Sequence, residues 1–345
     1  MSETVSAVTL EDAGSQLQFE TVACDLCHST ESIKVLDGVD WEFGRQETFP
    51  IVQCKSCSLV YQNPRPALSS IPFVYPPAYG FYQKSRGLQR FFLWRFPQSV
   101  YYRLAYPYPY LKGIKPGRIL DVGCATGRTN YPYGRNGSLL QLKKLGWDVS
   151  GLEFDPKAAE IARNHGITVQ VGRLPDGAFL GERFDVIRFN HVLEHSVSPS
   201  ADLAAAAALL EEGGRIIVSG PNIDSAPFFL FQKYWSGLDL PRHFYHFTPV
   251  TLRKYFEAVG LPVQHCYYDG WPDDFLHSTR HFLQSEALIG RNGVCQGNPQ
   301  TTEDAVTRLF SFFTRACLRV GVSTLTSFFN RIGKSDSFTI VGVRE

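Results

Sequence analysis

Short apolar segments and helical segments alternate along the chain from about residue 115 onward. The apolar segments are rich in β-branched residues, as buried strands are, and helix-like stretches lie between them. This alternation predicts a parallel sheet whose strands are joined by crossover helices, which is an α/β fold. The predicted strands cover residues 118–123, 147–153, 167–171, 184–189 and 215–220.

The helices predicted between these strands cover residues 138–146, 156–166 and 199–214. Proline is favoured in the first turn of a helix and glycine just after its last turn. The third helix is therefore expected to begin at Pro199 and to stop at Gly213 and Gly214. Farther along, the sequence predicts a helix over 248–259 and strands over 261–268 and 337–345.

The charge of the chain argues against a nucleic-acid partner. Its 345 residues include 34 Lys and Arg against 33 Asp and Glu, a net charge of +1, so no overall field attracts a phosphate backbone. The first twenty residues lack the basic start and apolar core of a signal peptide, and no run reaches the roughly 18 apolar residues of a membrane-spanning helix. We therefore expect a soluble, cytoplasmic protein that does not bind DNA.

Four of the eight cysteines form two Cys-x-x-Cys pairs, Cys24 with Cys27 and Cys54 with Cys57. One turn can present both thiolates of such a pair to a metal ion, and two turns complete a tetrahedral Zn²⁺ site. Four thiolates leave no open position for a catalytic water, so the zinc would be structural. A redox pair would need no second pair, and disulfides are disfavoured in a reducing cytosol. The spacing thus predicts a zinc ribbon.

The chain divides into four predicted parts. A polar N-terminal tail precedes the ribbon, and an aromatic, partly helical connector follows it, either covering the core of the next domain or forming one wall of a substrate cleft. The parts are a disordered tail over 1–20, the zinc ribbon over 21–66, the connector over 67–112, and an α/β domain over 113–345 with insertions near 129–137, 222–247 and 269–335.

A glycine-rich turn, LDVGCATG, ends the first strand of the α/β domain. Gly123 and Gly127 would let the backbone approach a ligand closely there. Glu153 ends the second strand, where an acidic side chain can bind both hydroxyls of a ribose. A dinucleotide site would instead carry G-x-G-x-x-G, and the carboxylate of Asp121 in this turn suits a cationic ligand better than a diphosphate.

The segments LDVGCATG, GLEFDP, FDVIRFNHVLEH and LLEEGGRIIVSGPN resemble successive motifs of class I S-adenosylmethionine-dependent methyltransferases, over about residues 115–262 plus the last strand. The resemblance implies a Rossmann-like seven-stranded sheet of order 3-2-1-4-5-7-6 with strand seven antiparallel, and S-adenosylmethionine as cofactor. It also implies one role for each matching position. Asp121, Gly123 and Gly127 would line the methionine end, Glu153 would bind the ribose, Phe154 would flank the adenine, Asn190 and His191 would border the sulfonium, and Ala125 replaces a usual glycine in the turn.

The segment WSGLDLPRHFYHFTPVTLRKYFEAVGL and the cysteine ribbon resemble a bacterial subgroup linked to methylation of sugars, polysaccharides or small metabolites. The resemblance implies a small-molecule or sugar and glycan-precursor acceptor. An RNA methyltransferase is one alternative, because some of these enzymes carry an N-terminal zinc module, but the chain has no basic run. A non-catalytic cofactor-binding or interaction module is the other. The oligomeric state is left open.

Histidines gather in two loops that follow the fourth and fifth strands. An oxygen or carbon acceptor usually loses a proton when it is methylated, and histidine titrates closest to working pH. We predict His243 as the general base, with His195 as a second candidate. Contacts with the acceptor are predicted for Arg242, which would orient an anionic group, and for Trp235, Tyr245 and His246, with packing as the alternative.

Two further patterns are left open. HVLEH resembles the LEH of ubiquinone-type O-methyltransferases, some of which hold a divalent cation with E-x-x-E-H, so His191, Glu194 and His195 could form a metal triad; a hydrogen-bonded helix start is favoured. An amphipathic helix is predicted within 304–333, as core, dimer face or peripheral contact with a membrane that carries lipid-linked sugars.

Overall fold

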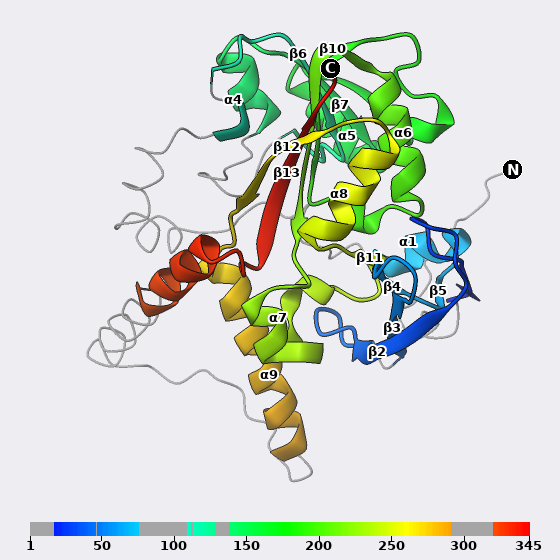
Figure 1. Ribbon diagram of the computed structural model, residues 1–345, viewed down its shortest axis with the longest axis vertical. Helices are drawn as coiled ribbons and strands as arrows, with labels where there is room; N and C mark the ends of the chain where they lie inside the picture. The colour runs from blue at the N-terminus through cyan, green and yellow to red at the C-terminus, as the bar shows by residue number, and fades with distance from the viewer. Residues whose placement is uncertain (1–16, 46, 76–108, 112, 128–137, 291–319) are drawn as a thin grey trace, which may run out of the picture.

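The computed structural model describes residues 17–45, 47–75, 109–111, 113–127, 138–290 and 320–345 (Figure 1). Most of the predicted tail and of the connector therefore lies outside the described residues, as does the insertion near 129–137. The first part of the predicted amphipathic helix lies outside them too, and residues 320–331 are helical.

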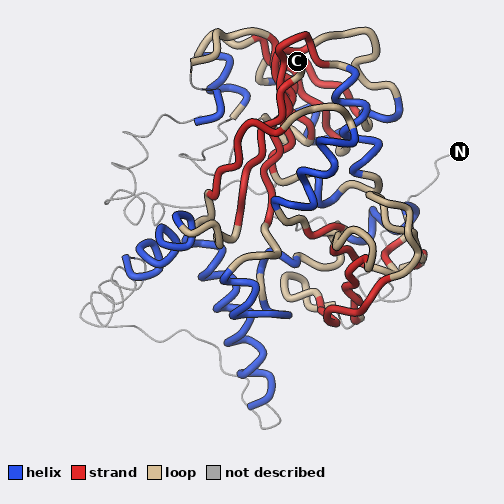
Figure 2. The backbone as a smooth tube through the Cα atoms, in the orientation of Figure 1, coloured by secondary structure: helices blue, strands red, loops and turns tan. Residues whose placement is uncertain are grey.

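A seven-stranded sheet forms the centre of the molecule (Figures 1 and 2). Read from β8, its order is β8-β7-β6-β9-β10-β13-β12, which is the predicted 3-2-1-4-5-7-6. Strand β13 runs antiparallel to both of its neighbours. The prediction of a Rossmann-like methyltransferase sheet is thus confirmed. The strands are β6 (Arg118–Val122), β7 (Asp148–Glu153), β8 (Thr168–Val171), β9 (Phe184–Asn190), β10 (Leu210–Pro221), β12 (Val263–Tyr268) and β13 (Ser337–Val343).

Helices cover both faces of this sheet. Successive side chains of a strand point to opposite faces, and in β6 Ile119 joins one buried apolar cluster while Leu120 joins the other. Residues of α4 (Leu139–Lys144) and α5 (Pro156–Asn164) pack in the cluster of Ile119, and residues of α6 (Pro199–Ala208) and α8 (Pro249–Ala258) pack in that of Leu120. Each helix is preceded by a polar residue whose side chain accepts a backbone N–H of the first turn. These residues are Ser138, Asp155, Ser198 and Thr248.

Helix α6 is shorter than its glycines predicted. It ends at Ala208, and Leu210 already pairs with Phe184 in the sheet. The register between β10 and β9 then shifts before Arg215, and Gly213, with φ 72°, lies in that irregular stretch. The expected helix stop at Gly213 and Gly214 is therefore wrong, because a glycine with positive φ also serves a bulge within a strand.

The N-terminal part forms a second, smaller sheet of order β11-β4-β3-β2. Its edge strand β11 (Tyr245–His246) comes from the predicted insertion over 222–247 and pairs with β4. The cluster of Leu120 continues into this part through Cys54, Leu59 and Phe244, so the two sheets share one apolar core. The N-terminal strands are β2 (Ser32–Val39), β3 (Thr48–Cys54) and β4 (Val60–Gln62), with β1 (Phe19–Glu20) paired to β5 (Arg65–Pro66).

Two of the remaining helices, α7 and α9, lie beyond the ends of β10 and β12, and α1 lies beside the N-terminal strands (Figure 1). Helix α7 packs on α9, the longest helix of the described residues. Over the ranges that the structure describes, none of the helices has the length and apolar character needed to cross a membrane. These helices are α1 (Ile71–Val74) in the N-terminal part, α7 (Ala226–Phe231) and α9 (Pro272–Gly290).

Candidate functional site

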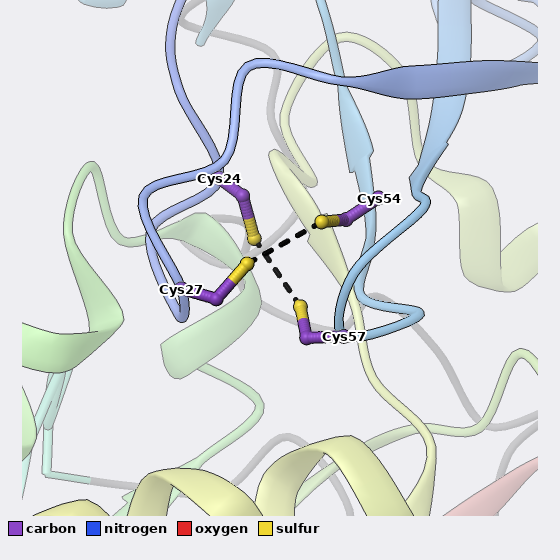
Figure 3. A group of neighbouring side chains, drawn as sticks. All are labelled: Cys24, Cys27, Cys54 and Cys57. Atoms are coloured by element: carbon purple, nitrogen blue, oxygen red, sulfur yellow. Dashed lines mark hydrogen bonds between the residues drawn. The ribbon is translucent and has the colours of Figure 1, made fainter.

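The two cysteine pairs meet at one point between their turns (Figure 3). The sulfurs of Cys24 and Cys57 are 3.4 Å apart, as are those of Cys27 and Cys54, and all four lie within 4.8 Å of one another. Zinc bonds of about 2.3 Å in a tetrahedron would place the sulfurs about 3.8 Å apart. The arrangement therefore fits a four-thiolate zinc ion.

The turns that carry the cysteines have matching geometry. The N–H of His28 donates to the carbonyl of Cys24 at 2.8 Å, and that of Ser58 donates to the carbonyl of Cys54 at 3.0 Å. Both His28 and Ser58 adopt left-handed backbone, with φ 60° and 67°. Burial raises the pKa of the Cys54 thiol, but N–H groups of Cys57 and Ser56 outweigh it and lower that pKa to about 7. Burial instead raises the pKa of the Cys24 and Cys57 thiols, and the thiolate is the form of cysteine that binds metal.

The glycine turn after β6 lies against the segment after β9. Gly123 and Gly127 have φ 68° and 69°, the left-handed region that favours glycine. A Cβ on Gly123 would lie 2.5 Å from Val192, and one on Gly127 would lie 2.3 Å from Ile167. Val192 and Ile167 therefore pack closely against the turn, and neither glycine position has room for a side chain.

Glu153, at the end of β7, holds this turn in place. Its Oε2 accepts the N–H of Ala125 at 2.7 Å, and its Oε1 accepts those of Phe154 and Asp155 at 2.9 and 3.0 Å. Burial raises the pKa of this carboxyl although the N–H groups act to lower it. Ala125 itself has φ 46°, so the glycine-like backbone of the turn is retained with an alanine. The predicted contact with a ribose stays a prediction.

The sequence led us to expect that the carboxylate of Asp121 faces a cationic ligand. In the structure it is paired with an arginine of the protein instead. The guanidinium of Arg188 on β9 donates to it twice, from Nε at 2.5 Å and from Nη2 at 2.7 Å, and both side chains are buried. Charge on Asp121 is thereby balanced inside the sheet. Arg188 was missed because it stands within an apolar strand segment, FDVIRF, where only a partner on the neighbouring strand explains an arginine.

The other predicted cofactor residues lie at the same edge of the sheet. Phe154 directly follows β7 and is 59% exposed. Asn190 ends β9 and His191 follows it with φ 54°, its N–H donating to the carbonyl of Ser219. Carboxyl ends of adjacent parallel strands form the ligand-binding edge of such sheets. The sequence thus placed these residues at one edge, and the side chains that would contact a ligand remain predictions.

Three side chains that bind protons or metals come together beyond β9: Glu194, His195 and His243 offer ligand atoms within 4.8 Å of one another. The rings of the two histidines are 4.5 Å apart, and Nε2 of His243 lies 4.0 Å from Oε1 of Glu194. Nδ1 of His195 lies 3.1 Å from the carbonyl of Arg242, and Nδ1 of His243 lies 2.9 Å from that of Gly237. Because a carbonyl only accepts, a proton on each Nδ1 would satisfy both contacts, and Nε2 of His243 then faces the carboxylates of Glu194 and Asp239 at 4.0 and 3.7 Å.

Glu194 is 1% exposed, and neither of its oxygens has a hydrogen-bond partner among the described residues. Burial alone would raise its pKa, but His191 at 3.5 Å and the charges of His243 and His195 lower it to about 2. Burial, followed by the charge of His243, lowers the pKa of His195 to about 4. The three groups could share a proton or hold a divalent cation. His243 takes the place that the sequence gave to His191 in such a triad.

Tyr75 is a further member of this site that the sequence did not indicate. Its hydroxyl lies 2.9 Å from Nδ1 of His195, and it follows α1 in the predicted connector. The many tyrosines of that segment have no period that would single one out.

The predicted stacking residues are buried instead. Trp235 donates from Nε1 to Asp336 at 2.9 Å, and the ring of Tyr245 lies between those of Tyr61 and Phe247 at 6.3 and 6.2 Å. Neither ring presents a face to an acceptor in this structure, so the packing alternative describes them.

Arg242 is 1% exposed and lies in ion pairs with Asp40 and Asp239. Its guanidinium is therefore not directed at an anionic acceptor. His246 is also buried, and neither ring nitrogen has a partner in the part of the chain described here. Burial and the charge of His243 lower its pKa to about 3.

The buried, neutral ring of His246 predicts a pH-dependent stability. An unfolded histidine takes up a proton below about pH 6.5, whereas His246 in the folded chain stays neutral to about pH 3. Stability is therefore fully present above pH 6.5 and falls as the pH drops below it, by about 2 kcal/mol at pH 5. Urea unfolding at pH 7.5 and pH 5 is expected to show a smaller decrease for His246→Gln than for the wild type. His265→Gln, at an exposed site on β12, is the control and should keep the wild-type decrease.

Comparison with known proteins identifies related sequences. A family model described as a methyltransferase domain matches residues 83–265, more than half of the 345 residues. A ubiquinone biosynthesis O-methyltransferase of Cereibacter sphaeroides is 36% identical over 111 residues, which are 30% of this chain and 41% of the relative. A protein of the same name from Xanthomonas oryzae is 32% identical over 161 residues, 43% of this chain and 63% of the relative. The chain thus spans less than two thirds of the length of these relatives.

Among solved structures, a SAM dependent methyltransferase from Archaeoglobus fulgidus is similar, with 16% identity and a TM-score of 0.42. The match covers 74% of this chain and 99% of that chain.

Proposed function

Because the chain belongs to the class I S-adenosylmethionine-dependent methyltransferases, we propose that it transfers a methyl group from this cofactor to a small-molecule acceptor. The observation that carries the proposal is the turn from Gly123 to Gly127, tied by Glu153 to the end of the neighbouring strand. Strands β6 and β9 flank the point where the strand order reverses, which is where such sheets bind ligands.

S-adenosylmethionine, when bound, supplies a methyl group on a positively charged sulfur. The turn from Gly123 to Gly127 suits this cofactor because its glycines carry no side chain, so that a ligand can approach the backbone of the turn closely. Glu153 has two carboxylate oxygens with about four acceptor positions, of which three N–H groups use three. One acceptor position therefore remains for a ribose hydroxyl.

His243 is our candidate for the general base. Its Nδ1 lies 2.9 Å from the carbonyl of Gly237, and Nε2, 3.7 Å from Asp239, is the atom to which we assign the proton of an acceptor hydroxyl. The negative charge of Glu194, 4.0 Å from that nitrogen, stabilises the imidazolium that results. His195 lies beside it with the same tautomer and offers a second acceptor for the proton.

The acceptor that we propose is a hydroxyl-bearing small molecule, and within that class a sugar or glycan precursor. The names of the relatives from Cereibacter and Xanthomonas describe O-methylation in ubiquinone biosynthesis, which supports an oxygen acceptor. The sugar assignment rests on the resemblance of the segment around PRHFYHF to the sugar and metabolite subgroup.

Two measurements test the proposal. Calorimetric titration is expected to show binding of S-adenosylmethionine, and absence of binding by the wild type would contradict it. A screen of nucleotide sugars, phenols and RNA with cofactor labelled in the methyl group is expected to label a nucleotide sugar or a phenol. Label in RNA alone would establish the RNA alternative, and binding without any transfer would favour a non-catalytic module.

Replacement of His243 by glutamine is expected to lower kcat by about 10²- to 10⁴-fold, the usual contribution of a general base. The affinity for S-adenosylmethionine should change little, because His243 lies in the loop after α7 and not in the glycine turn. Steady-state kinetics and calorimetry give the two values. His265→Gln, with an exposed side chain on β12, should retain wild-type kcat. A His243→Gln enzyme with wild-type kcat would exclude His243 as the base.

A further inference from the structure

A buried ion pair joins the N-terminal sheet to the histidine loop. The guanidinium of Arg242 donates to Asp40, from Nη1 at 3.1 Å and from Nη2 at 2.9 Å, and it donates to Asp239 from Nε at 2.9 Å. Asp40 directly follows β2, and it and Arg242 are each 1% exposed. The pair thus links two positions that are 202 residues apart in the sequence.

Asp40 is itself fixed in place. Its Oδ1 accepts the N–H groups of Glu42 and Phe43 at 3.2 and 3.0 Å. The ring of Phe43 also lies against the guanidinium of Arg242, with the charged carbon 5.0 Å from the ring centre. Asp40 and Phe43 of the N-terminal part therefore help to hold the guanidinium, together with Asp239 and the carbonyl of Leu240 in the histidine loop itself.

The main chain of Arg242 forms part of the histidine site. Its carbonyl lies 3.1 Å from Nδ1 of His195, which also lies 2.9 Å from the hydroxyl of Tyr75, and the next residue is His243. The N–H groups of Arg242 and His243 both donate to the carbonyl of Asp239, at 2.8 and 3.1 Å. A shift of the Arg242 side chain would therefore move a carbonyl that contacts Nδ1 of His195 and the backbone that carries His243.

Apolar packing alone could hold the two sheets together, without the buried charges of Asp40 and Arg242. A buried ion pair contributes little net stability compared with well-packed apolar residues, whereas its geometry is directional. We propose that Asp40 is a positioning residue of the N-terminal sheet, which acts through Arg242 to hold His195 and His243 in their catalytic orientation. The assignment rests on the proposed function for the role of the histidines, and on the contacts of Asp40 and Arg242 for the mechanism.

The test compares Asp40→Asn with Asp37→Asn in the full chain. Asp37 lies on β2, three residues before Asp40, but forms an exposed pair with Lys34, so its replacement is the matched control. Nitrogen-15 NMR of labelled histidines reports tautomers without turnover, and His195→Gln assigns the signal. In Asp40→Asn we expect the His195 signal to lose its single Nδ1–H form. We also expect kcat to fall by about 10- to 100-fold, as for a small misplacement of a reacting group, with the cofactor affinity within about twofold of wild type.

Several outcomes would overturn the proposal. One is an Asp40→Asn protein with the wild-type His195 signal, and another is one with wild-type kcat. A third is an equal change in Asp37→Asn, which would show a general effect of the strand. If Asp40→Asn does not fold, Asp40→Glu gives the same readouts, because it keeps the charge but displaces the carboxylate. A wild-type protein with the fixed tautomer but no methyl transfer would refute the proposed function alone.

Discussion

Replacing Cys57 by serine is expected to release the metal and to unfold the N-terminal sheet. Four thiolates within 4.8 Å of one another fit zinc, and a structural zinc ion contributes about 10 to 16 kcal/mol of apparent folding free energy in small domains. Cys57 belongs to the same buried cluster as Leu59 and Phe244, so the loss should extend to the histidine loop. Metal analysis is expected to give about one zinc per wild-type chain and far less for the variant, which should also unfold at lower urea.

Cys266→Ser is the control for this experiment. Cys266 is a half-buried free cysteine on β12, away from the four-cysteine group, so this variant should keep its zinc. Wild-type protein without zinc, with four freely reactive thiols in the folded state, would contradict the ribbon. A Cys57→Ser protein that retains a full zinc equivalent would do the same.

Replacing Gly123 by alanine is expected to weaken binding of S-adenosylmethionine by at least about 30-fold, if the bound state retains the two costs below in full. Left-handed backbone at φ 68° costs an alanine about 1 to 2 kcal/mol. The new Cβ would also lie 2.5 Å from Val192, and overpacking of this kind typically costs about 1 to 3 kcal/mol. Relief of this contact would displace both the glycine turn and the segment after β9. Calorimetric titration measures the change in affinity.

The matched control is Gly181→Ala. Gly181 has φ 84°, so the backbone penalty is similar, but nothing lies within 4 Å of the position of its Cβ. This variant should lose some stability and keep its affinity for the cofactor. If both variants bind S-adenosylmethionine as the wild type does, the turn is not the cofactor site.

Local sequence pattern predicted the large sheet well. Each strand is a short apolar segment, and the helices between strands indicated parallel neighbours. The seven-stranded order, with its antiparallel β13, was expected only from the resemblance to class I methyltransferases. The end of α6 could not be predicted, because Gly213 has the same backbone preference in a strand bulge as after a helix.

The parts of the site that were missed depend on pairs distant in sequence. Arg188 pairs with Asp121 across two strands, and Arg242 pairs with Asp40 across 202 residues. Each arginine alone is equally compatible with binding a ligand or a carboxylate of the protein. Burial decides between these, and burial is a property of the assembled fold.

The pairing of β11 with β4 also affects how the chain can fold during synthesis. Roughly 180 residues separate the two strands, and at about 5 to 20 residues per second the ribosome needs roughly 10 to 40 s to make them. During that time the hydrogen-bonding edge of β4 has no strand to pair with, and such edges are prone to aggregation. Binding of zinc to the four cysteines would order strands β2 to β4 before the ribosome has made β11.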